Sequence, residues 1–539
     1  MGAPSFRYNI KMTSRAAPPS SLNTFVPVCS LLTRHAKAHP NKPALVDVDS
    51  GQRVQFKNLQ LAVEQSAVKL LSSGLRAGEK VLLTGDNSIA KIILWLAIWR
   101  AGGVVCPLDP GFIRTSLDTV LSAIDPTFIL AASTTDHDLD TSTLPDSVRV
   151  ITYWDTLDNG VVMLDPSASP EKAYLRNRHS TNPLPAPCQP SDIACIACTS
   201  GTTGQPKIVV YDHKAMWLNG LDSIYLLALE PNDRMLEYRS FNWYSSQILS
   251  LMPFLQTGFT LHVARRFSLR RFGQWVHTHQ LTVSVGVPTI IQLLLKEPIA
   301  QHETLLSSLR VITSSTAPLA AQYWHAFEHY YQRPLINLYG STETGWISGN
   351  TLNERKLGSV GRVLNSVKLS FTTQPPIPGD APVLRPFLVE TEKIALGYLN
   401  TDGTLHSLRG KPFLMRDAAQ LDADGYLHVW GRTDDLIIRG GVKISPAEIE
   451  ATVANHPHIQ DAAVIGLPDA LYGMQIVCFF VPQQHHATPT VNIVQHCRLA
   501  LPLEKIPQRF IPLSRLPRNH RGKILKRQLL ALAKNFLNS

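Results

Sequence analysis

From about residue 43 onward, apolar runs of strand length alternate with longer stretches that have helical spacing. A run at 42–49 is followed by an amphipathic stretch at 59–75, a run at 80–87, an apolar stretch at 90–103 that ends in two glycines, and a run at 104–109. Strands that alternate with helices favour an α/β architecture with mostly parallel strands. We therefore predict a large N-terminal α/β domain built from several subdomains.

The pattern changes after residue 431, where the chain reads as a hairpin, then a helix, then a strand. Ser445 and Pro446, followed by Glu448, are a typical helix start with a polar cap and a proline in the first turn. The C-terminal segment is therefore expected to form a separate, small α+β domain. A length of 539 residues allows roughly two to four structural units.

The composition favours a globular protein that binds small anions. Hydrophobic residues make up 44% of the chain and charged residues 17%, which excludes a disordered protein. The formal net charge is +10, but no long run of Lys and Arg is present, so anionic small molecules are better partners than nucleic acid. Cys195 and Cys198 lie three residues apart in an apolar run, where a strand would direct them to opposite faces rather than to one metal or redox site.

The N-terminal segment and the cysteines indicate in which cellular compartment the protein is expected. The first 45 residues contain six basic residues and no acidic one, which is typical of a flexible leader, here 1–24, and leaves organellar targeting open. No apolar run is long enough to cross a bilayer. The seven cysteines show no disulfide framework, which favours a reducing compartment. We therefore expect a cytoplasmic protein with no membrane span.

The nine residues TSGTTGQPK, from Thr199 to Lys207, follow directly on an apolar run, and we call them the phosphate loop. Glycines free the backbone to surround an anion with N–H groups, and hydroxyls and an ammonium add further donors. The spacing is not that of a Walker A loop. The candidate phosphate-binding residues are Thr199, Ser200, Gly201, Thr202, Thr203, Gly204 and Lys207.

This loop resembles the signature of the acyl-adenylate-forming superfamily, which includes acyl-CoA synthetases, firefly luciferase and the adenylation domains of peptide synthetases. Two further strings resemble motifs of that family: SSTAPL at Ser314–Leu319, here the adenine loop, and YGSTETG at Tyr339–Gly345, here the strand-end motif. Segments around Asp417, Arg432 and the C-terminus follow in the family's order. The chain is identified as a member of this superfamily over residues 25–535.

The resemblance implies a role for each of these motifs in binding ATP and magnesium. Tyr339 would stack on adenine, Thr342 would meet the α-phosphate, and Glu343 would hold Mg²⁺, a hard cation that prefers oxygen ligands. Asp417 would bind the ribose hydroxyls, although Met415-Arg416 stands where the family has Thr-Gly. The further residues implied to contact ATP or AMP are Ser315, Thr316, Ala317, Gly340, Ser341 and Arg432.

The C-terminal motifs imply a mobile catalytic domain. Asp434 would be the pivot between domains, Gly440-Gly441 would line the channel for the pantetheine of CoA, and Lys523 would be the catalytic lysine, with Lys526 and Arg527 as nearby alternatives. An ammonium between a carboxylate and the α-phosphate contributes about 4 kcal/mol at an effective dielectric near 20, or roughly a thousandfold in rate. The implied domains are 25–433, which binds AMP, and 434–539, which moves.

We call Ser240–Gln247 (SFNWYSSQ) the acid segment, because it lies where the family shapes its acyl pocket. Asn242 stands where enzymes that activate amino acids have an aspartate and many acyl-CoA synthetases have a histidine, which disfavours an α-amino acid. Packing in the protein core would explain the apolar side chains of this segment as well as a pocket would. Arg239 could pair with a second carboxylate of the substrate. The candidate pocket residues are Phe241, Asn242, Trp243 and Trp346.

The predicted activity is ATP-dependent formation of acyl-AMP with release of pyrophosphate, followed by transfer of the acyl group to CoA. ATP, Mg²⁺, CoA and a carboxylic acid are the implied cofactor and substrates. Transfer to an amine or to a carrier protein is one alternative, and a catalytically silent binding protein on the same scaffold is another. The identity of the acid and the oligomeric state stay open.

Overall fold

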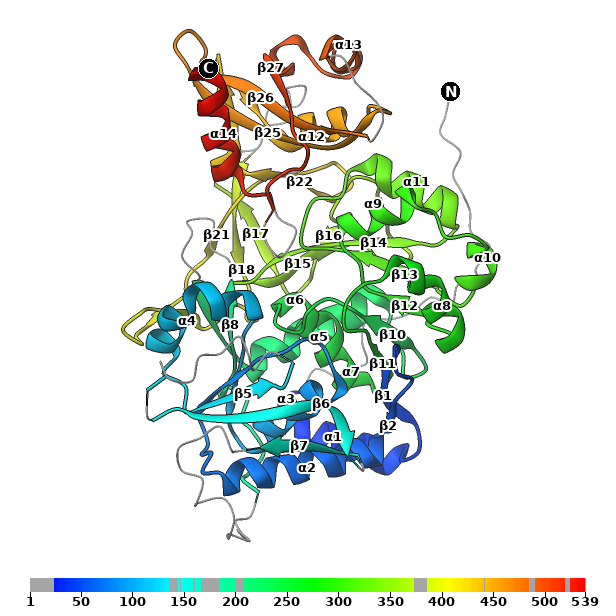
Figure 1. Ribbon diagram of the computed structural model, residues 1–539, viewed down its shortest axis with the longest axis vertical. Helices are drawn as coiled ribbons and strands as arrows, with labels where there is room; N and C mark the ends of the chain where they lie inside the picture. Colours follow the sequence, from blue (N-terminus) through cyan, green and yellow to red (C-terminus); the bar gives the residue numbers. More distant parts are fainter. Residues whose placement is uncertain are drawn as a thin grey trace.

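The computed structural model describes residues 24–538 apart from 135–143, 146, 159, 166–183, 200–206, 373–384, 441, 484–489 and 519–523. Two nine-stranded sheets and one four-stranded sheet form the larger part of the molecule. A three-stranded sheet with its helices forms a smaller C-terminal part, which is stacked on one end of the larger part (Figure 1). The predicted combination of a large α/β domain and a small α+β domain is confirmed.

The first sheet has the strand order β16-β15-β14-β13-β12-β10-β11-β1-β2, with parallel strands from β1 to β14 and antiparallel strands at both edges. The parallel centre agrees with the alternation of strands and helices in the sequence. The strands are β1 (Pro43–Asp47), β2 (Arg53–Gln55), β10 (Arg234–Glu237), β11 (Thr260–Val263), β12 (Val283–Ser284), β13 (Val311–Ser314), β14 (Leu335–Ser341), β15 (Gly345–Gly349) and β16 (Arg362–Val363).

The second sheet has the order β20-β19-β9-β8-β4-β3-β5-β6-β7, and its strands from β8 to β6 in that order are parallel. Cys195 and Cys198 on β8 belong to two different core clusters, so they point to opposite faces of the sheet as predicted. The strands are β3 (Lys80–Leu83), β4 (Val104–Pro107), β5 (Phe128–Ala132), β6 (Arg149–Asp158), β7 (Val161–Asp165), β8 (Ile193–Thr199), β9 (Lys207–Asp212), β19 (Gly397–Leu399) and β20 (Leu405–Ser407).

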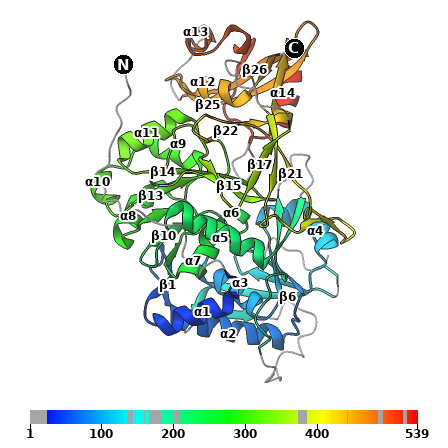
Figure 2. The ribbon, with the colours of Figure 1, turned by 180° about the vertical axis from the view of Figure 1, so that it is seen from behind.

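Two helices lie between the sheets. Helix α3 (Ile89–Arg100) contacts β1 of the first sheet and β3 and β4 of the second, and α5 (His213–Leu227) contacts β15 as well as β8 and β9. Figure 2 shows α5 across the middle of the larger part. Every residue of α3 from Ile89 to Trp99 is buried, which explains why this helix is apolar on nearly all sides.

The remaining helices of the larger part cover the outer faces of the sheets or connect their strands. None of the helices in the described part of the chain is both long and apolar enough to span a membrane. These helices are α1 (Val28–Ala38), α2 (Phe56–Ser72), α4 (Pro110–Ile124), α6 (Tyr244–Ser246), a π-helical turn (Gln247–Leu251), α7 (Met252–Thr257), α8 (Leu269–His279), α9 (Pro288–Lys296), α10 (His302–Leu305) and α11 (Ala321–Tyr331).

The C-terminal third contains the antiparallel four-stranded sheet and the small domain. The strands of that sheet are β17 (Lys368–Phe371), β18 (Arg385–Glu390), β21 (Phe413–Leu421) and β22 (Leu427–Arg432). The small domain contains the hairpin β23 (Ile437–Arg439) and β24 (Val442–Ile444), then α12 (Pro446–Ala454), β25 (Ile459–Asp469), β26 (Gly473–Pro482), α13 (Thr490–Ala500), β27 (Arg509–Pro512) and α14 (Lys526–Asn538).

The small domain has the predicted order of hairpin, helix and strand. One face of its sheet packs on α12 and α13, and the other packs on α14. Helix α12 begins at Pro446 as expected, but the predicted polar cap is wrong. The Ser445 hydroxyl donates to the carbonyl oxygen of Trp430 at 2.5 Å instead, because strand β22 lies within its reach.

Candidate active site

The carboxyl ends of β13 and β14 lie side by side, because these parallel strands pair Ser314 with Asn337. The adenine loop continues from the end of β13, and the strand-end motif spans the end of β14 and the start of β15. Thr316 has a φ of 73°, which a β-branched residue rarely adopts outside functional loops. Ligands of open α/β sheets bind at such carboxyl edges. Two of the predicted motifs therefore meet where a ligand site is expected.

Glu343 connects this edge to the second sheet. Its Oε1 accepts a hydrogen bond from the Tyr398 hydroxyl at 2.6 Å, and the Nζ of Lys207 lies 3.7 Å from the same oxygen. The Lys207 ammonium also lies over the Tyr398 ring, 4.9 Å from its centroid. Burial, together with the Glu343 carboxylate, raises the pKa of Tyr398, so its hydroxyl stays protonated and remains a donor.

The surroundings of Glu343 fit a magnesium ligand. Its side chain is 16% exposed. The described residues contain no cluster of three or more His, Cys, Asp or Glu side chains that could by itself form a metal site. Magnesium is usually bound through one or two carboxylates, with the remaining ligands supplied by substrate phosphates and water. A single carboxylate beside a lysine matches that pattern for a magnesium-bound triphosphate.

A second pair joins the strand-end motif to the four-stranded sheet. The Tyr339 hydroxyl donates to the carboxylate of Asp417 on β21, and Asp417 stands opposite Arg432 of β22. Burial and the negative charge of Asp417 raise the pKa of Tyr339 well above its ordinary value. The predicted adenine platform, the predicted ribose ligand and a cation are therefore brought together.

Tyr211, which the sequence analysis did not assign, connects this region to Tyr244 of the acid segment. The Tyr211 hydroxyl donates to the backbone oxygen of Thr342 at 2.7 Å, and its ring stacks on that of Tyr244 with centroids 3.9 Å apart. Asn219 donates to the Tyr244 hydroxyl at 3.2 Å and accepts the backbone N–H of Trp346 at 3.0 Å. The acid segment is thereby held against the strand-end motif. No local signal marks Tyr211 or Tyr398, because their partners lie far away in the sequence.

Gly340 is required by close packing within the strand-end motif. A Cβ at this position would lie 2.2 Å from the carbonyl oxygen of Gly345, which is backbone and cannot move aside. Ser341 accepts the backbone N–H of Thr344 at 3.1 Å and so closes the turn between β14 and β15. The local fold thus explains the small residues of the motif.

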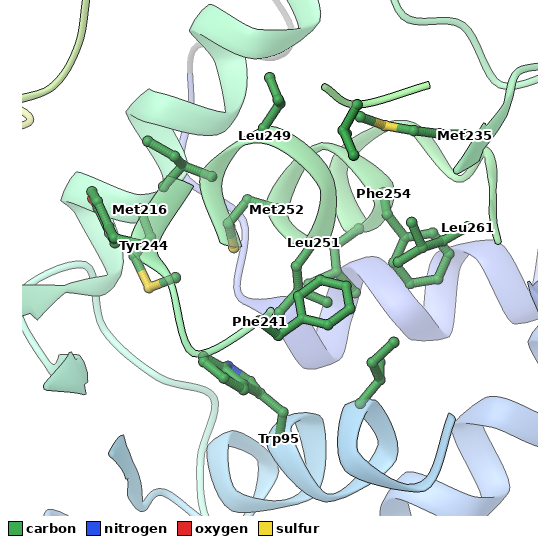
Figure 3. Packing of buried hydrophobic residues seen from close by; sticks show 14 of the residues in the cluster. Trp95, Met216, Met235, Phe241, Tyr244, Leu249, Leu251, Met252, Phe254 and Leu261 are labelled. Carbon is green, nitrogen blue, oxygen red and sulfur yellow. The ribbon is translucent and has the colours of Figure 1, made fainter. Parts of the chain in front are cut away.

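The four predicted acyl-pocket residues lie in different surroundings. Phe241 and Trp346 are 1% and 3% exposed and belong to the main core cluster. Figure 3 shows Phe241 close to Trp95 of α3. Asn242 is also buried, and Trp243 is half-buried. Core packing therefore accounts for Phe241 and Trp346.

Arg239, considered as a partner for a second substrate carboxylate, is paired within the protein. Its Nη2 lies 2.8 Å from Oε2 of Glu237, and both side chains are buried. Its Nη1 donates to the Ser315 hydroxyl at 3.3 Å. The guanidinium charge is thus balanced by a protein carboxylate and supports the start of the adenine loop.

Asp434 lies in the short helical turn between β22 and β23. Its Oδ2 is 3.5 Å from Nη2 of Arg432 and 3.6 Å from Nη1 of Arg416, which is one of the two residues that depart from the family pattern. The neighbouring Asp435 lies 3.3 Å from Nζ of Lys526, at the start of α14. The predicted pivot is therefore surrounded by ion pairs between exposed or partly exposed side chains.

Several predicted residues fall outside the described part of the chain. Thr199 and Lys207 face each other at the end of the β8–β9 hairpin. Gly440 is exposed beside the β23–β24 turn, and its N–H donates to the Tyr472 carbonyl at 2.8 Å. The predicted residues that lie outside the described ranges are Ser200, Gly201, Thr202, Thr203, Gly204, Gly441 and Lys523.

Comparison with known protein families settles the membership. The model of the AMP-binding enzyme family matches residues 32–373, more than half of the chain, and the model of the AMP-binding enzyme C-terminal domain matches residues 448–523. The chain belongs to the AMP-binding enzyme family. The superfamily that the motifs predicted is therefore confirmed.

This AMP-binding enzyme is similar to named CoA ligases along nearly its full length. The sulfoacetate–CoA ligase of Cupriavidus necator is 28% identical over 96% of this chain and 99% of its own. The oxalate–CoA ligase of Arabidopsis thaliana is also 28% identical, over 94% and 98%. The ATP-bound MatB from Rhodopseudomonas palustris shares the fold, with a TM-score of 0.81 and 23% identity over 95% of this chain and all of its own.

Proposed function

We propose that this AMP-binding enzyme is an AMP-forming acid–CoA ligase. The observation that carries the proposal is the meeting of Lys207 with Glu343, beside the Tyr339–Asp417 pair, at one edge of the first sheet. A triphosphate needs a cation and a magnesium ligand, and a nucleoside needs a flat ring and an acceptor for its hydroxyls. The similarity to two named CoA ligases supports CoA as the acyl acceptor.

In the first step, a carboxylate oxygen of the acid attacks the α-phosphorus of ATP, and the bond to pyrophosphate breaks. Lys207 binds the triphosphate, Asp417 accepts hydrogen bonds from the ribose hydroxyls, and Glu343 would hold a magnesium ion. Bound magnesium would neutralise phosphate charge. The Lys523 ammonium approaches the carboxylate and the α-phosphate together, which reduces the repulsion between two anions.

In the second step, the thiol of CoA loses its proton and attacks the acyl carbon of acyl-AMP, and AMP leaves. The domain that begins at Asp434 turns about this residue, so that Lys523 withdraws and the Gly440-Gly441 segment faces the adenylate. One pocket can serve two reactions in this way because the moving domain presents a different surface in each.

A panel of carboxylic acids, assayed with ATP and Mg²⁺ in the presence and absence of CoA, tests the proposal. We expect one class of acid to release pyrophosphate, and to consume the free thiol of CoA in equal amount. The two named relatives act on acids that carry a second anionic group, so such acids come first in the panel.

The other outcomes identify the alternatives. Release of pyrophosphate without loss of the CoA thiol contradicts the ligase and favours transfer to an amine or to a carrier protein. If no acid supports pyrophosphate release or exchange, the chain is a binding protein on this scaffold and the proposal fails.

A further inference from the structure

Lys91, in the first turn of α3, carries a completely buried ammonium group between the two large sheets. Its Nζ donates to the carbonyl oxygen of Gly85 at 2.6 Å and to Oδ1 of Asn242 at 2.7 Å. Both acceptors are neutral. Burying a charge is costly unless it is paired with an opposite charge, and a buried ionisable group of this kind is a candidate for a functional role.

Several charged groups surround this ammonium. Asp86 is itself bound by two arginines, with Nε of Arg265 at 2.7 Å and Nη2 of Arg266 at 3.4 Å, so its charge is already offset. Burial lowers the pKa of Lys91 to about 8, even though nearby carboxylates oppose this change. Lys91 is therefore mainly a cation at neutral pH. The carboxylates that face it are those of Asp86, Asp109 and Asp155.

The start of α3 is hydrogen-bonded to the acid segment and to the residue before it. Besides the Lys91 contact with Asn242, the side chain of Asn87 donates to the Arg239 carbonyl at 2.8 Å and accepts the Phe241 N–H at 2.9 Å. The Lys91 ammonium is therefore in direct contact with the acid segment, through Asn242.

The acid segment is also linked to Thr342, next to which the acid is expected to react. Tyr244 stacks on Tyr211, whose hydroxyl bonds to the backbone of Thr342, the residue assigned to the α-phosphate. The reacting carboxylate has to reach that phosphate, so the rest of a small acid extends from the strand-end motif toward its neighbours, one of which is the acid segment.

We propose that the Lys91 ammonium determines substrate specificity by favouring acids that carry a second anionic group away from the reacting carboxylate. This inference rests on the proposed function, because it assigns a preference to the same acid site. A charge in a poorly polarisable core acts over several ångströms without direct contact. Asn242 holds the ammonium without neutralising it, whereas an aspartate would form an ion pair with it.

The test compares kcat/KM for pyrophosphate release with succinate and with butyrate, which lacks the second carboxylate. We expect the wild-type enzyme to prefer succinate, and Lys91→Met to lower the succinate-to-butyrate ratio by about tenfold. Asn242→Asp should lower the ratio as well, because the new carboxylate cancels the charge. Lys57→Met replaces an exposed lysine of α2 and should leave the ratio unchanged.

A pH profile of the wild-type enzyme tests the same point without a variant. Succinate stays dianionic above neutral pH, so the ratio should fall as the pH rises through about 8, and this fall should be absent in Lys91→Met. If Lys91→Met slows both acids equally, the lysine only positions the segment and the inference is wrong. If Lys91→Met does not fold, Asn242→Asp and the wild-type profile decide.

Failure of this inference can be told apart from failure of the proposed function. An enzyme that activates acids but shows no preference for a second anionic group overturns the role of Lys91 alone. An enzyme that activates no acid overturns the ligase proposal itself.

Discussion

The site edge of the first sheet and the junction with the small domain differ in how their charged groups are held. At the site edge, short hydrogen bonds link partly or fully buried groups, as in Tyr398 to Glu343 at 2.6 Å and Tyr211 to Thr342 at 2.7 Å. At the junction, the Ser445 hydroxyl donates to the Trp430 carbonyl, but the charged side chains of Asp434 and Arg416 are both exposed and lie 3.6 Å apart. Such a pair typically contributes less than about 1 kcal/mol. This difference supports the proposal that the small domain turns while the site edge keeps its geometry.

The largest effect is expected for Lys523 of the small domain, which should be needed for the first reaction step and not for the second. Lys523→Ala removes the small domain's cation from adenylation, so acyl-AMP formation should fall by roughly a thousandfold. Thioester formation from supplied acyl-AMP should be largely retained, because the lysine has withdrawn by then. Pyrophosphate exchange and thiol loss measure the two steps. Lys526→Ala is the matched control. A larger loss of acyl-AMP formation in Lys526→Ala than in Lys523→Ala would contradict the prediction. Equal loss of both steps in Lys523→Ala would contradict a domain that turns between them.

The buried charge of Lys91 should make the stability of the folded protein depend on pH. The pKa of Lys91 is about 8 in the folded protein and 10.5 ordinarily, so the unfolded chain holds this proton more tightly. The wild-type protein should therefore gain stability over Lys91→Met as the pH rises from about 8 to about 10.5, by up to roughly 3 kcal/mol. Urea unfolding of both proteins across this range measures the difference. A difference that does not change with pH would show that burial does not lower the pKa of Lys91.

Glu343→Gln tests the metal ligand at the site edge. Loss of the charge should lower the rate of pyrophosphate exchange by on the order of a hundredfold and raise the magnesium concentration needed for half-maximal rate. Tyr398→Phe removes only the hydrogen bond to the same carboxylate and should have a smaller effect. An unchanged magnesium dependence in Glu343→Gln would mean that another group holds the ion.

The smallest expected effect lies at the junction. Arg416→Ala removes one ion pair from Asp434, so the step that needs domain rotation should change by less than about fivefold, and the change should diminish at high salt. Adenylation should be nearly unaffected. Thiol loss from supplied acyl-AMP at two salt concentrations measures this, with Arg515→Ala, an exposed arginine of the small domain, as control. An effect as large as that of Lys523→Ala would show that the junction is not weakly held.

The sequence by itself determined the fold class and the family. Strand and helix periods are local properties, so the runs at 42–49 and 80–87 contain β1 and β3, and the stretch at 90–103 contains most of α3. A phosphate-binding loop can also be recognised locally, because its glycines and hydroxyl groups belong to one short turn of the chain. This is why the order of a few short motifs was enough to predict an AMP-binding enzyme.

Only the tertiary structure decided which side chains meet. Lys91 and Asn242 lie 151 residues apart, and Glu343 and Tyr398 lie 55 residues apart, so no local pattern connects either pair. The same holds for Ser445, whose hydroxyl was predicted to cap a helix but bonds to Trp430 of β22. Side-chain partners depend on how the sheets pack against each other, because a hydrogen bond requires two atoms within about 3 Å and periodicity sets only the face on which a residue lies.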